Sequence, residues 1–140
     1  MAYVQMPFYA GGNLRQWLGA APIAAGRKAQ RKRLLRGLLD AVKHVHDVHM
    51  VHNDIKLENV VLTDAGEAGE AVLIDFEYSH DEGNYSETKK LGGTNVYMAP
   101  EREHKNGRPA HPGDARSDMY SVRVHSRIYA PHNNDIYIYI

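Results

Sequence analysis

The chain has 140 residues, 43% hydrophobic and 24% charged, which suits one soluble globular domain rather than two. Seventeen Lys and Arg residues against seventeen Asp and Glu residues give a formal net charge of +0, so no overall field favours nucleic acid or a membrane as a partner. The absence of cysteine excludes disulfides and thiolate metal sites, and no apolar run approaches the roughly 18 residues of a membrane span. The N-terminus lacks the layout of a signal peptide, so we expect an intracellular, cytoplasmic protein.

The first part of the chain predicts a short strand, a flexible joint and two helices. The stretch AYVQMPF (2–8) alternates well enough for a strand, two glycines (11–12) interrupt it, and LRQWL (14–18) begins a helical turn. A longer helix is predicted within residues 27–50, because its leucines and valines recur at steps of one, three and four residues. Its apolar face comprises Leu34, Leu35, Leu38, Leu39, Val42 and Val45. Its polar face comprises Arg31, Lys32, Arg36, Asp40, Lys43 and His44.

A β-hairpin is predicted next. The β-branched runs NVVL (59–62) and AVLI (71–74) are separated by a polar loop that contains glycines. Asp54 lies shortly before the first run, and Asp75 directly follows the second. Because antiparallel strands run back on each other, we expect Asp54, Asn59 and Asp75 to converge. The expected fold class is α+β, mainly α with a small β-hairpin.

The rest of the chain has weaker patterns. Residues 77–116 are polar and rich in Gly, Pro, His and Ser without a sustained period, which predicts a long loop region. From Val122 the sequence changes character and ends in DIYIYI (135–140). An edge strand, a disordered tail and a terminus foreign to the domain all stay open for this end. We therefore treat residues 123–140 as an atypical or disordered tail.

The polar cluster around the hairpin has the composition of a magnesium and phosphate site. Two carboxylates and an amide, from Asp54, Asp75 and Asn59, can supply the oxygen ligands that Mg²⁺ prefers. Lys56 can offset charge on a transferring phosphoryl group.

Four motifs occur in a fixed order, namely HNDIKLEN (52–59), DFE (75–77), GGTNVYMAPE (92–101) and SDMYS (117–121). This order is similar to the C-terminal lobe of a eukaryotic protein kinase, whose catalytic loop reads H-R-D-x-x-x-x-N and is followed by D-F-G and A-P-E. Four motifs in the right order rarely occur by chance. The resemblance implies that residues 1–122 are a partial protein kinase domain with hinge, catalytic loop, metal-binding motif and activation segment.

The resemblance also implies a reaction, which is ATP-dependent phosphoryl transfer to serine or threonine hydroxyls of a protein substrate. ATP and Mg²⁺ would be the cofactors. Asp54 would orient the substrate hydroxyl and accept its proton, and Lys56 would contact the transferring phosphoryl. Asn59 and Asp75 would hold the metal ions. The position of Lys56 two residues after Asp54, together with Thr94, resembles the serine/threonine rather than the tyrosine kinases.

The stretch QMPFYAGGNL resembles the hinge between the two lobes of the family, where the nucleotide binds. Met6 would be the gatekeeper, and the Pro7 carbonyl and Tyr9 amide would meet the adenine edge. Asn13 would lie near the ribose. Val61 would pack under the adenine ring.

Around the catalytic loop the sequence matches the family at some positions and departs from it at others. Asp118 resembles the buried Asp that ties down this loop, and His52 and Phe76 resemble the residues stacked behind the metal site. Asn53 replaces the Arg of H-R-D, so the cation that pairs with a phosphorylated activation loop is missing. Glu77 replaces the Gly of D-F-G and adds a negative charge beside the metal ligand.

Three functions therefore compete. Because the chain begins at the hinge, the Gly-rich loop and the Lys–Glu pair of a kinase would lie upstream, and we expect a kinase fragment that is inactive in isolation. A non-catalytic, pseudokinase-like binding module is the alternative. A metal site built from His44, His46, His49 and His52 is the third, although no H-E-x-x-H motif occurs and catalytic zinc needs three convergent ligands.

Overall fold

The computed structural model describes residues 5–20, 27–64, 66, 69–83, 92–103 and 111–129, with residues 27–28 and 125–129 described by their backbone alone. The α-helices of this part are α1 (Leu14–Gly19), α2 (Arg27–Asp47) and α3 (Ala115–Tyr129). Its strands are β1 (Met50–Val51), β2 (Val60–Leu62), β3 (Ala71–Leu73) and β4 (His80–Asp81). Its short 3₁₀ turns are η1 (Leu57–Asn59), η2 (Asn95–Tyr97) and η3 (Pro100–Arg102). The fold is α+β and mainly helical, as predicted.

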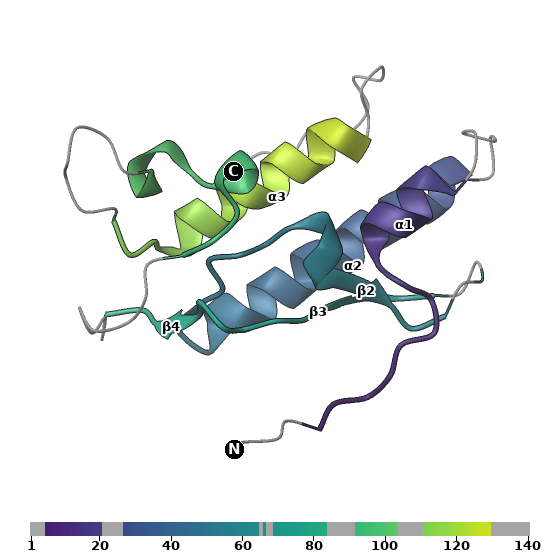
Figure 1. Ribbon diagram of the computed structural model, residues 1–140, viewed down its shortest axis with the longest axis horizontal. Helices are drawn as coiled ribbons and strands as arrows, with labels where there is room; N and C mark the ends of the chain where they lie inside the picture. Colours follow the sequence, from purple (N-terminus) through teal and green to yellow (C-terminus); the bar gives the residue numbers. More distant parts are fainter. Residues whose placement is uncertain are drawn as a thin grey trace.

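Helix α2 is the central element, with the β2–β3 hairpin on one side and α3 on the other (Figure 1). Its predicted apolar face is buried except for Leu39, which is partly buried, and Leu38 at its middle is 0% exposed. The core cluster joins α2 to the hairpin through Leu73 and to α3 through Val122. Lys32, Asp40 and His44 lie on the exposed face, so the amphipathic pattern predicted for α2 is confirmed.

The predicted hairpin is also confirmed. Strands β2 and β3 pair antiparallel, with Val60 opposite Leu73 and Leu62 opposite Ala71. Val60 and Leu62 face the core, while Val61 between them is half-buried on the other face. The hairpin thus places its polar flanks, residues 54–59 and Asp75, at one end.

Strands β1 and β4 form a second antiparallel pair that the sequence did not predict. Met50 lies opposite Asp81, and Val51 lies opposite His80. Strands of two residues have no measurable alternation, so β4 fell within the segment that we expected to be loop. The pairing holds the start of residues 52–59 against the chain that follows the hairpin.

The N-terminal segment runs beside β2. The expected strand at 2–8 is not a strand in its described part, since residues 5–8 have no regular structure, and residues 1–4 lie outside the described residues. Gly11 N donates to Leu62 O (3.1 Å), and Leu62 N donates to Gly12 O (2.9 Å). Asn13 then caps α1, because its Oδ1 accepts from Gln16 N (2.9 Å).

Helix α3 begins where the sequence predicted the end of a loop. Asp114 supplies the N-terminal cap, since its Oδ1 accepts from Ser117 N (3.0 Å). The Ser117 hydroxyl in turn donates to Asp114 O (2.7 Å). The helix continues through residues 123–129, where we expected an atypical tail to begin. Residues 130–140, on which the readings of the DIYIYI end depend, lie outside the described residues.

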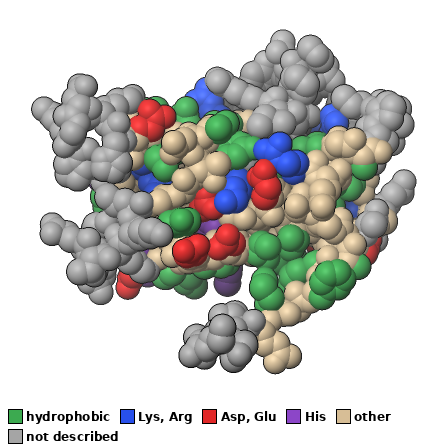
Figure 2. Space-filling view, viewed as in Figure 1, with side chains coloured by type: hydrophobic (Ala, Val, Ile, Leu, Met, Phe, Trp, Pro, Cys, Tyr) green, Lys and Arg blue, Asp and Glu red, His purple; other side chains and the backbone are tan. Residues whose placement is uncertain are grey.

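The surface combines exposed apolar side chains near the N-terminus with mixed charges elsewhere. Figure 2 shows hydrophobic side chains over the N-terminal segment, and acidic and basic side chains close together at the middle of the same face. Phe8 is 92% exposed and Met6 is 55% exposed. Within the described ranges, no helix combines the length and the apolar character needed to cross a membrane.

Candidate active site

The loop between β1 and η1 presents a buried carboxylate, Asp54, which is 3% exposed. Its Oδ1 accepts a hydrogen bond from Thr94 Oγ1 (2.8 Å). Its Oδ2 accepts from Lys56 Nζ (2.6 Å) and from Asn59 Nδ2 (3.0 Å). The amide of Asn59 also donates to Asp54 O (2.9 Å). Two segments that are distant in sequence therefore hold one carboxylate.

The protonation state of Asp54 follows from these contacts. Burial by itself would raise the pKa of this carboxyl, but the hydrogen bonds from Lys56 and Thr94 outweigh it and hold the pKa below its ordinary value. The hydrogen bond to Asp54 raises the pKa of Lys56. The pair is therefore ionised at neutral pH. A carboxylate with a lowered pKa is a weak base, so its main capacity is to orient a hydroxyl group.

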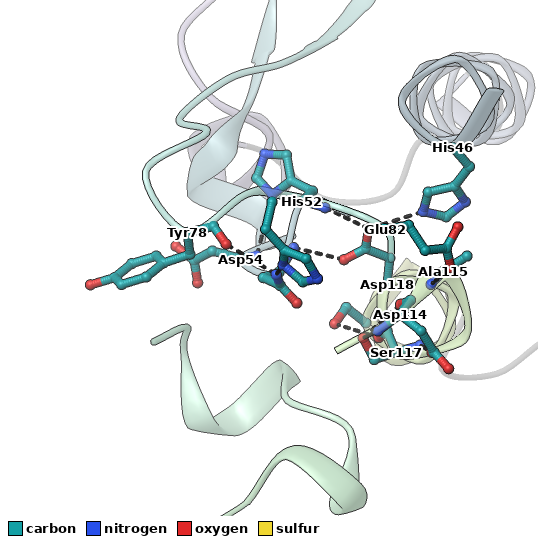
Figure 3. Close-up of polar contacts among 12 residues, drawn as sticks. His46, His52, Asp54, Tyr78, Glu82, Asp114, Ala115, Ser117 and Asp118 are labelled. Atoms are coloured by element: carbon teal, nitrogen blue, oxygen red, sulfur yellow. Dashed lines mark hydrogen bonds and ion pairs between the residues drawn. The ribbon is translucent and has the colours of Figure 1, made fainter. Parts of the chain in front are cut away.

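A second buried carboxylate, Asp118 on α3, supports the backbone in front of Asp54 (Figure 3). Its Oδ2 accepts from His52 N (2.8 Å), and its Oδ1 accepts from Asn53 N (2.8 Å). His46 on α2 also approaches, with its Nε2 3.0 Å from Asp118 Oδ2. Two charge-assisted bonds to adjacent amides fix the direction in which the loop enters the site. This geometry agrees with the tie that the family resemblance implied for Asp118.

His52 lies behind Asp54 and is neutral. Its Nδ1 accepts from Asp54 N (3.2 Å), which leaves Nε2 protonated to donate to Ile74 O (3.1 Å). Burial lowers the pKa of His52, although the charge of Asp118 opposes this. The ring contacts that of Phe76 with centroids 4.7 Å apart, as the resemblance implied, but the planes are tilted by 59° rather than stacked.

Asn53 connects the loop to the segment after the hairpin. Its φ of 69° is in the left-handed region, which Asn tolerates better than most residues. Its Nδ2 donates to Tyr78 O (3.0 Å) and lies 2.7 Å from His80 Nδ1. The family has an Arg at this position. Here the short, neutral side chain of Asn53 connects the loop to residues 78–80 at the start of β4.

Asn59 and Asp75 fit the oxygen-ligand chemistry of Mg²⁺. Asn59 uses Nδ2 for its contacts with Asp54, and within the described residues its Oδ1 accepts no hydrogen bond. Asp75 is exposed just after β3, and its charge contributes to raising the pKa of Lys56 and opposes the lowering of the pKa of His52. The backbone brings the two residues near each other, because Ile74 N, directly before Asp75, donates to Asn59 O (2.9 Å). An amide oxygen and a carboxylate supply part of a Mg²⁺ ligand set, which substrate phosphates usually complete. The donor set is therefore suitable.

The histidines do not form a metal site in the part of the chain that the structure describes. No group of three or more His, Cys, Asp or Glu side chains there could hold a metal ion. His44 and His49 are exposed, whereas His46 and His52 are engaged with Asp118 and Ile74.

The residues proposed for the nucleotide lie along the N-terminal segment and β2. Asn13 and Val61 are brought together by an antiparallel bridge. The Asn13 Oδ1 is occupied by the cap of α1, so its amide nitrogen is the atom left for a ligand. Met6 and Pro7 are exposed, and Tyr9 is half-buried on the stretch that leads to this bridge.

Two residues matter to the geometry of the site in ways that the sequence did not indicate. Thr94 was noted only as an indicator of substrate type, yet its hydroxyl binds Asp54 directly. Arg102 is 4% exposed and contacts the backbone on both sides of the site. A buried arginine inside a polar, aperiodic segment has no signature in sequence, although its place directly after the A-P-E motif could have marked it for attention.

The sequence pattern of the protein kinase domain family matches residues 1–127. A rabbit (Oryctolagus cuniculus) serine/threonine-protein kinase 17A is 31% identical over 119 residues, which cover 85% of this chain and 29% of the relative. The inhibitor of nuclear factor kappa-B kinase subunit alpha of Gallus gallus is 33% identical over 97 residues, which cover 69% of this chain and 13% of the relative. A bifunctional serine/threonine-protein kinase/NEDD4-like E3 ubiquitin-protein ligase of Dictyostelium discoideum is 28% identical over 131 residues, which cover 88% of this chain and 7% of the relative.

The chain therefore belongs to the protein kinase domain family, and its relatives include serine/threonine kinases. It spans less than a third of the length of each of these relatives.

Proposed function

We propose that this chain carries the phosphoryl-transfer centre of a serine/threonine protein kinase, which moves the terminal phosphoryl group of ATP to a hydroxyl of a protein substrate. The observation that carries the proposal is the buried Asp54 carboxylate, held by donors from Lys56, Asn59 and Thr94. The serine/threonine kinases among the relatives support the choice of acceptor hydroxyl.

The hydrogen bonds of Asp54 are unequally divided between its two oxygens. Oδ2 accepts from two side-chain donors, Lys56 and Asn59, whereas Oδ1 accepts from the single side-chain donor Thr94. Since a carboxylate oxygen can accept more than one hydrogen bond, Oδ1 is the oxygen that would accept the hydroxyl proton of the substrate. The hydroxyl oxygen then bonds to the terminal phosphorus, the bond from phosphorus to the bridging oxygen of ADP breaks, and the proton passes to Asp54.

Lys56 and the magnesium ligands would act on the phosphates. One N–H of the Lys56 ammonium is held by Asp54, and its other two can donate to phosphoryl oxygens. Asn59 Oδ1 and the Asp75 carboxylate would hold Mg²⁺. When it is bound, the ion neutralises negative charge on the phosphates of ATP.

The first experiment titrates the chain with ATP, with and without Mg²⁺, and records the thermal unfolding midpoint. Ligand at 100 times its dissociation constant stabilises by about 2.7 kcal/mol, so the shift is measurable. We expect stabilisation that requires Mg²⁺ and is lost in Asp75→Ala. Asp40→Ala, which removes an exposed carboxylate from the polar face of α2, should keep it. A folded chain that shows no Mg²⁺-dependent shift would contradict the proposal.

A non-catalytic binding module is the second candidate, favoured by the departures at Asn53 and Glu77. Asp54→Asn separates the two candidates, because it removes the base but keeps the size of the side chain. For a kinase we expect phosphoryl transfer to fall by about 10²- to 10⁴-fold while ATP binding persists. Binding of a partner protein that is unchanged in Asp54→Asn, together with no transfer by the wild-type chain, would favour the binding module.

A further inference from the structure

Arg102 connects two segments of backbone on either side of the candidate site. It lies at the end of η3 and is 4% exposed. Its NH1 donates to Asn53 O (2.8 Å), and its NH2 donates to Gly92 O (2.7 Å). The planar guanidinium presents its donors in a rigid fork, so it fixes the separation of the two carbonyls as well as binding each.

The two carbonyls belong to the segments that form the contact between Thr94 and Asp54. Asn53 directly precedes Asp54, and Gly92 lies two residues before Thr94. The hydroxyl of Thr94 meets Asp54 Oδ1 at 2.8 Å. Arg102 therefore holds the two segments next to the point where their side chains meet.

The packing around this connection is too close for side chains. A Cβ on Gly93, which has a φ of 131°, would lie 2.7 Å from Asn53 O. A Cβ on Gly113 would overlap Asn53 Oδ1 and lie 3.0 Å from Arg102 Nε. Real Cβ atoms essentially never approach this closely, so both glycines let the two segments and Arg102 come together.

We propose that Arg102 is a positioning residue that fixes residues 92–94 against the loop carrying Asp54, and thereby aligns the Asp54 carboxylate. Its catalytic consequence rests on the proposed kinase function, whereas its effect on the two segments does not. Asn53, which stands where the family has an Arg, contributes only its backbone carbonyl to this contact. The buried positive charge is supplied by Arg102.

The test compares Arg102→Met and Arg102→Lys with wild-type chain and with Arg36→Met, which replaces an exposed arginine of α2. Methionine keeps much of the volume without the fork, and lysine keeps the charge but cannot bridge both carbonyls in one plane. Circular dichroism establishes that each variant is folded. Two readouts follow, namely steady-state kinetics with ATP and a serine/threonine peptide, and amide hydrogen exchange of each variant.

If the wild-type chain transfers phosphate, we expect kcat to fall about 10- to 100-fold in Arg102→Met, with the KM for ATP within about twofold, because displacement of a catalytic group by about 1 Å can cost that much. The kcat of Arg102→Lys should lie between those of the wild type and Arg102→Met, and the kcat of Arg36→Met should match that of the wild type. Exchange should accelerate at Asn53 N, bound to Asp118, and at Tyr97 N, bound to Thr94 O, but not in the middle of α2.

Each outcome decides the proposal. Folded Arg102→Met with unchanged exchange at Asn53 and Tyr97 would overturn it. Amide exchange that accelerates equally in α2 would assign Arg102 to general stability and also overturn the proposal. The same conclusion would follow if neither Arg102→Met nor Arg102→Lys folds. Selective acceleration in a chain whose wild type transfers no phosphate would support the positioning role and count against the kinase function alone.

Discussion

The hydroxyl of Thr94 reaches Asp54 from 40 residues further along the chain. Thr94→Val keeps the shape of the side chain but removes the donor, which leaves the buried Oδ1 of Asp54 with one partner fewer. We expect a loss of about 1–3 kcal/mol in the free energy of unfolding. The pKa of Asp54 should rise, because the hydrogen bond from Thr94 lowers it.

Urea unfolding measures the stability of this variant, and carboxyl ¹³C NMR measures the pKa of Asp54. Thr94→Ser retains a hydroxyl and should restore both values in large part. If Thr94→Val titrates at the same pH as the wild type, the contact does not set the charge state of Asp54 in solution.

The contacts of single residues show how far a sequence motif can be taken. The antiparallel hairpin predicted that Asp54, Asn59 and Asp75 would converge, and the structure joins the first two by a hydrogen bond of 3.0 Å. The sequence did not predict Thr94 or Arg102 as neighbours of Asp54, because each is brought to the loop by the path of residues 92–103. Such contacts depend on tertiary packing and have no local pattern.

At the scale of elements, the pairing of the N-terminal segment with β2 depends on Gly11. A Cβ there would lie 2.5 Å from Leu62 O and closer still to Asp64 O. Gly11→Ala should therefore break the bonds between this segment and β2, lower the free energy of unfolding by about 1–3 kcal/mol, and weaken ATP binding.

Gly19→Ala is the matched control for Gly11→Ala, because a Cβ at Gly19 meets nothing within 4 Å. This residue ends α1, where alanine should leave stability unchanged or raise it by up to about 1 kcal/mol. Thermal unfolding with and without Mg²⁺–ATP measures both variants. Equal behaviour of the two would show that the segment can shift at no cost.

The elements that the sequence predicted are those with a repeating pattern. The leucines and valines of α2 define a face at helical spacing, and the two valine-containing runs of β2 and β3 flank a glycine-containing loop. Strands β1 and β4 are too short for a pattern. Helix α3 was missed although Asp114 and Ser117 are a recognisable cap, since the polar residues around them favoured a loop.

At the scale of the whole molecule, buried ionisable groups make stability depend on pH. Burial lowers the pKa of His52, so below its ordinary value of about 6.5 the unfolded chain binds a proton that the folded chain resists. Stability should therefore fall as the pH drops below about 6.5, by at most about 1.4 kcal/mol per pH unit for this one group. The lowered pKa of Asp54 adds a second loss as the pH falls below about 3.9.

Urea unfolding midpoints between pH 7.5 and pH 5 test this dependence. His52→Asn should unfold at lower urea than the wild type at pH 7.5 and show a flatter decline toward pH 5. His44→Asn removes an exposed histidine from α2 and should keep the slope of the wild type. Parallel curves for wild type and His52→Asn would contradict the role of His52.

The carboxylate of Asp118 has a further consequence, which concerns the order in which the protein can fold during synthesis. The amides of His52 and Asn53 that it binds lie 66 and 65 residues earlier in the chain. Helix α2 and the β2–β3 hairpin are complete well before Asp118 leaves the ribosome, and their contacts are local enough to form early. The loop that carries Asp54 cannot gain its final anchor until α3 has been made and has docked. The candidate catalytic geometry is therefore among the last features of the described part of the chain to form, after the helix and hairpin that surround it.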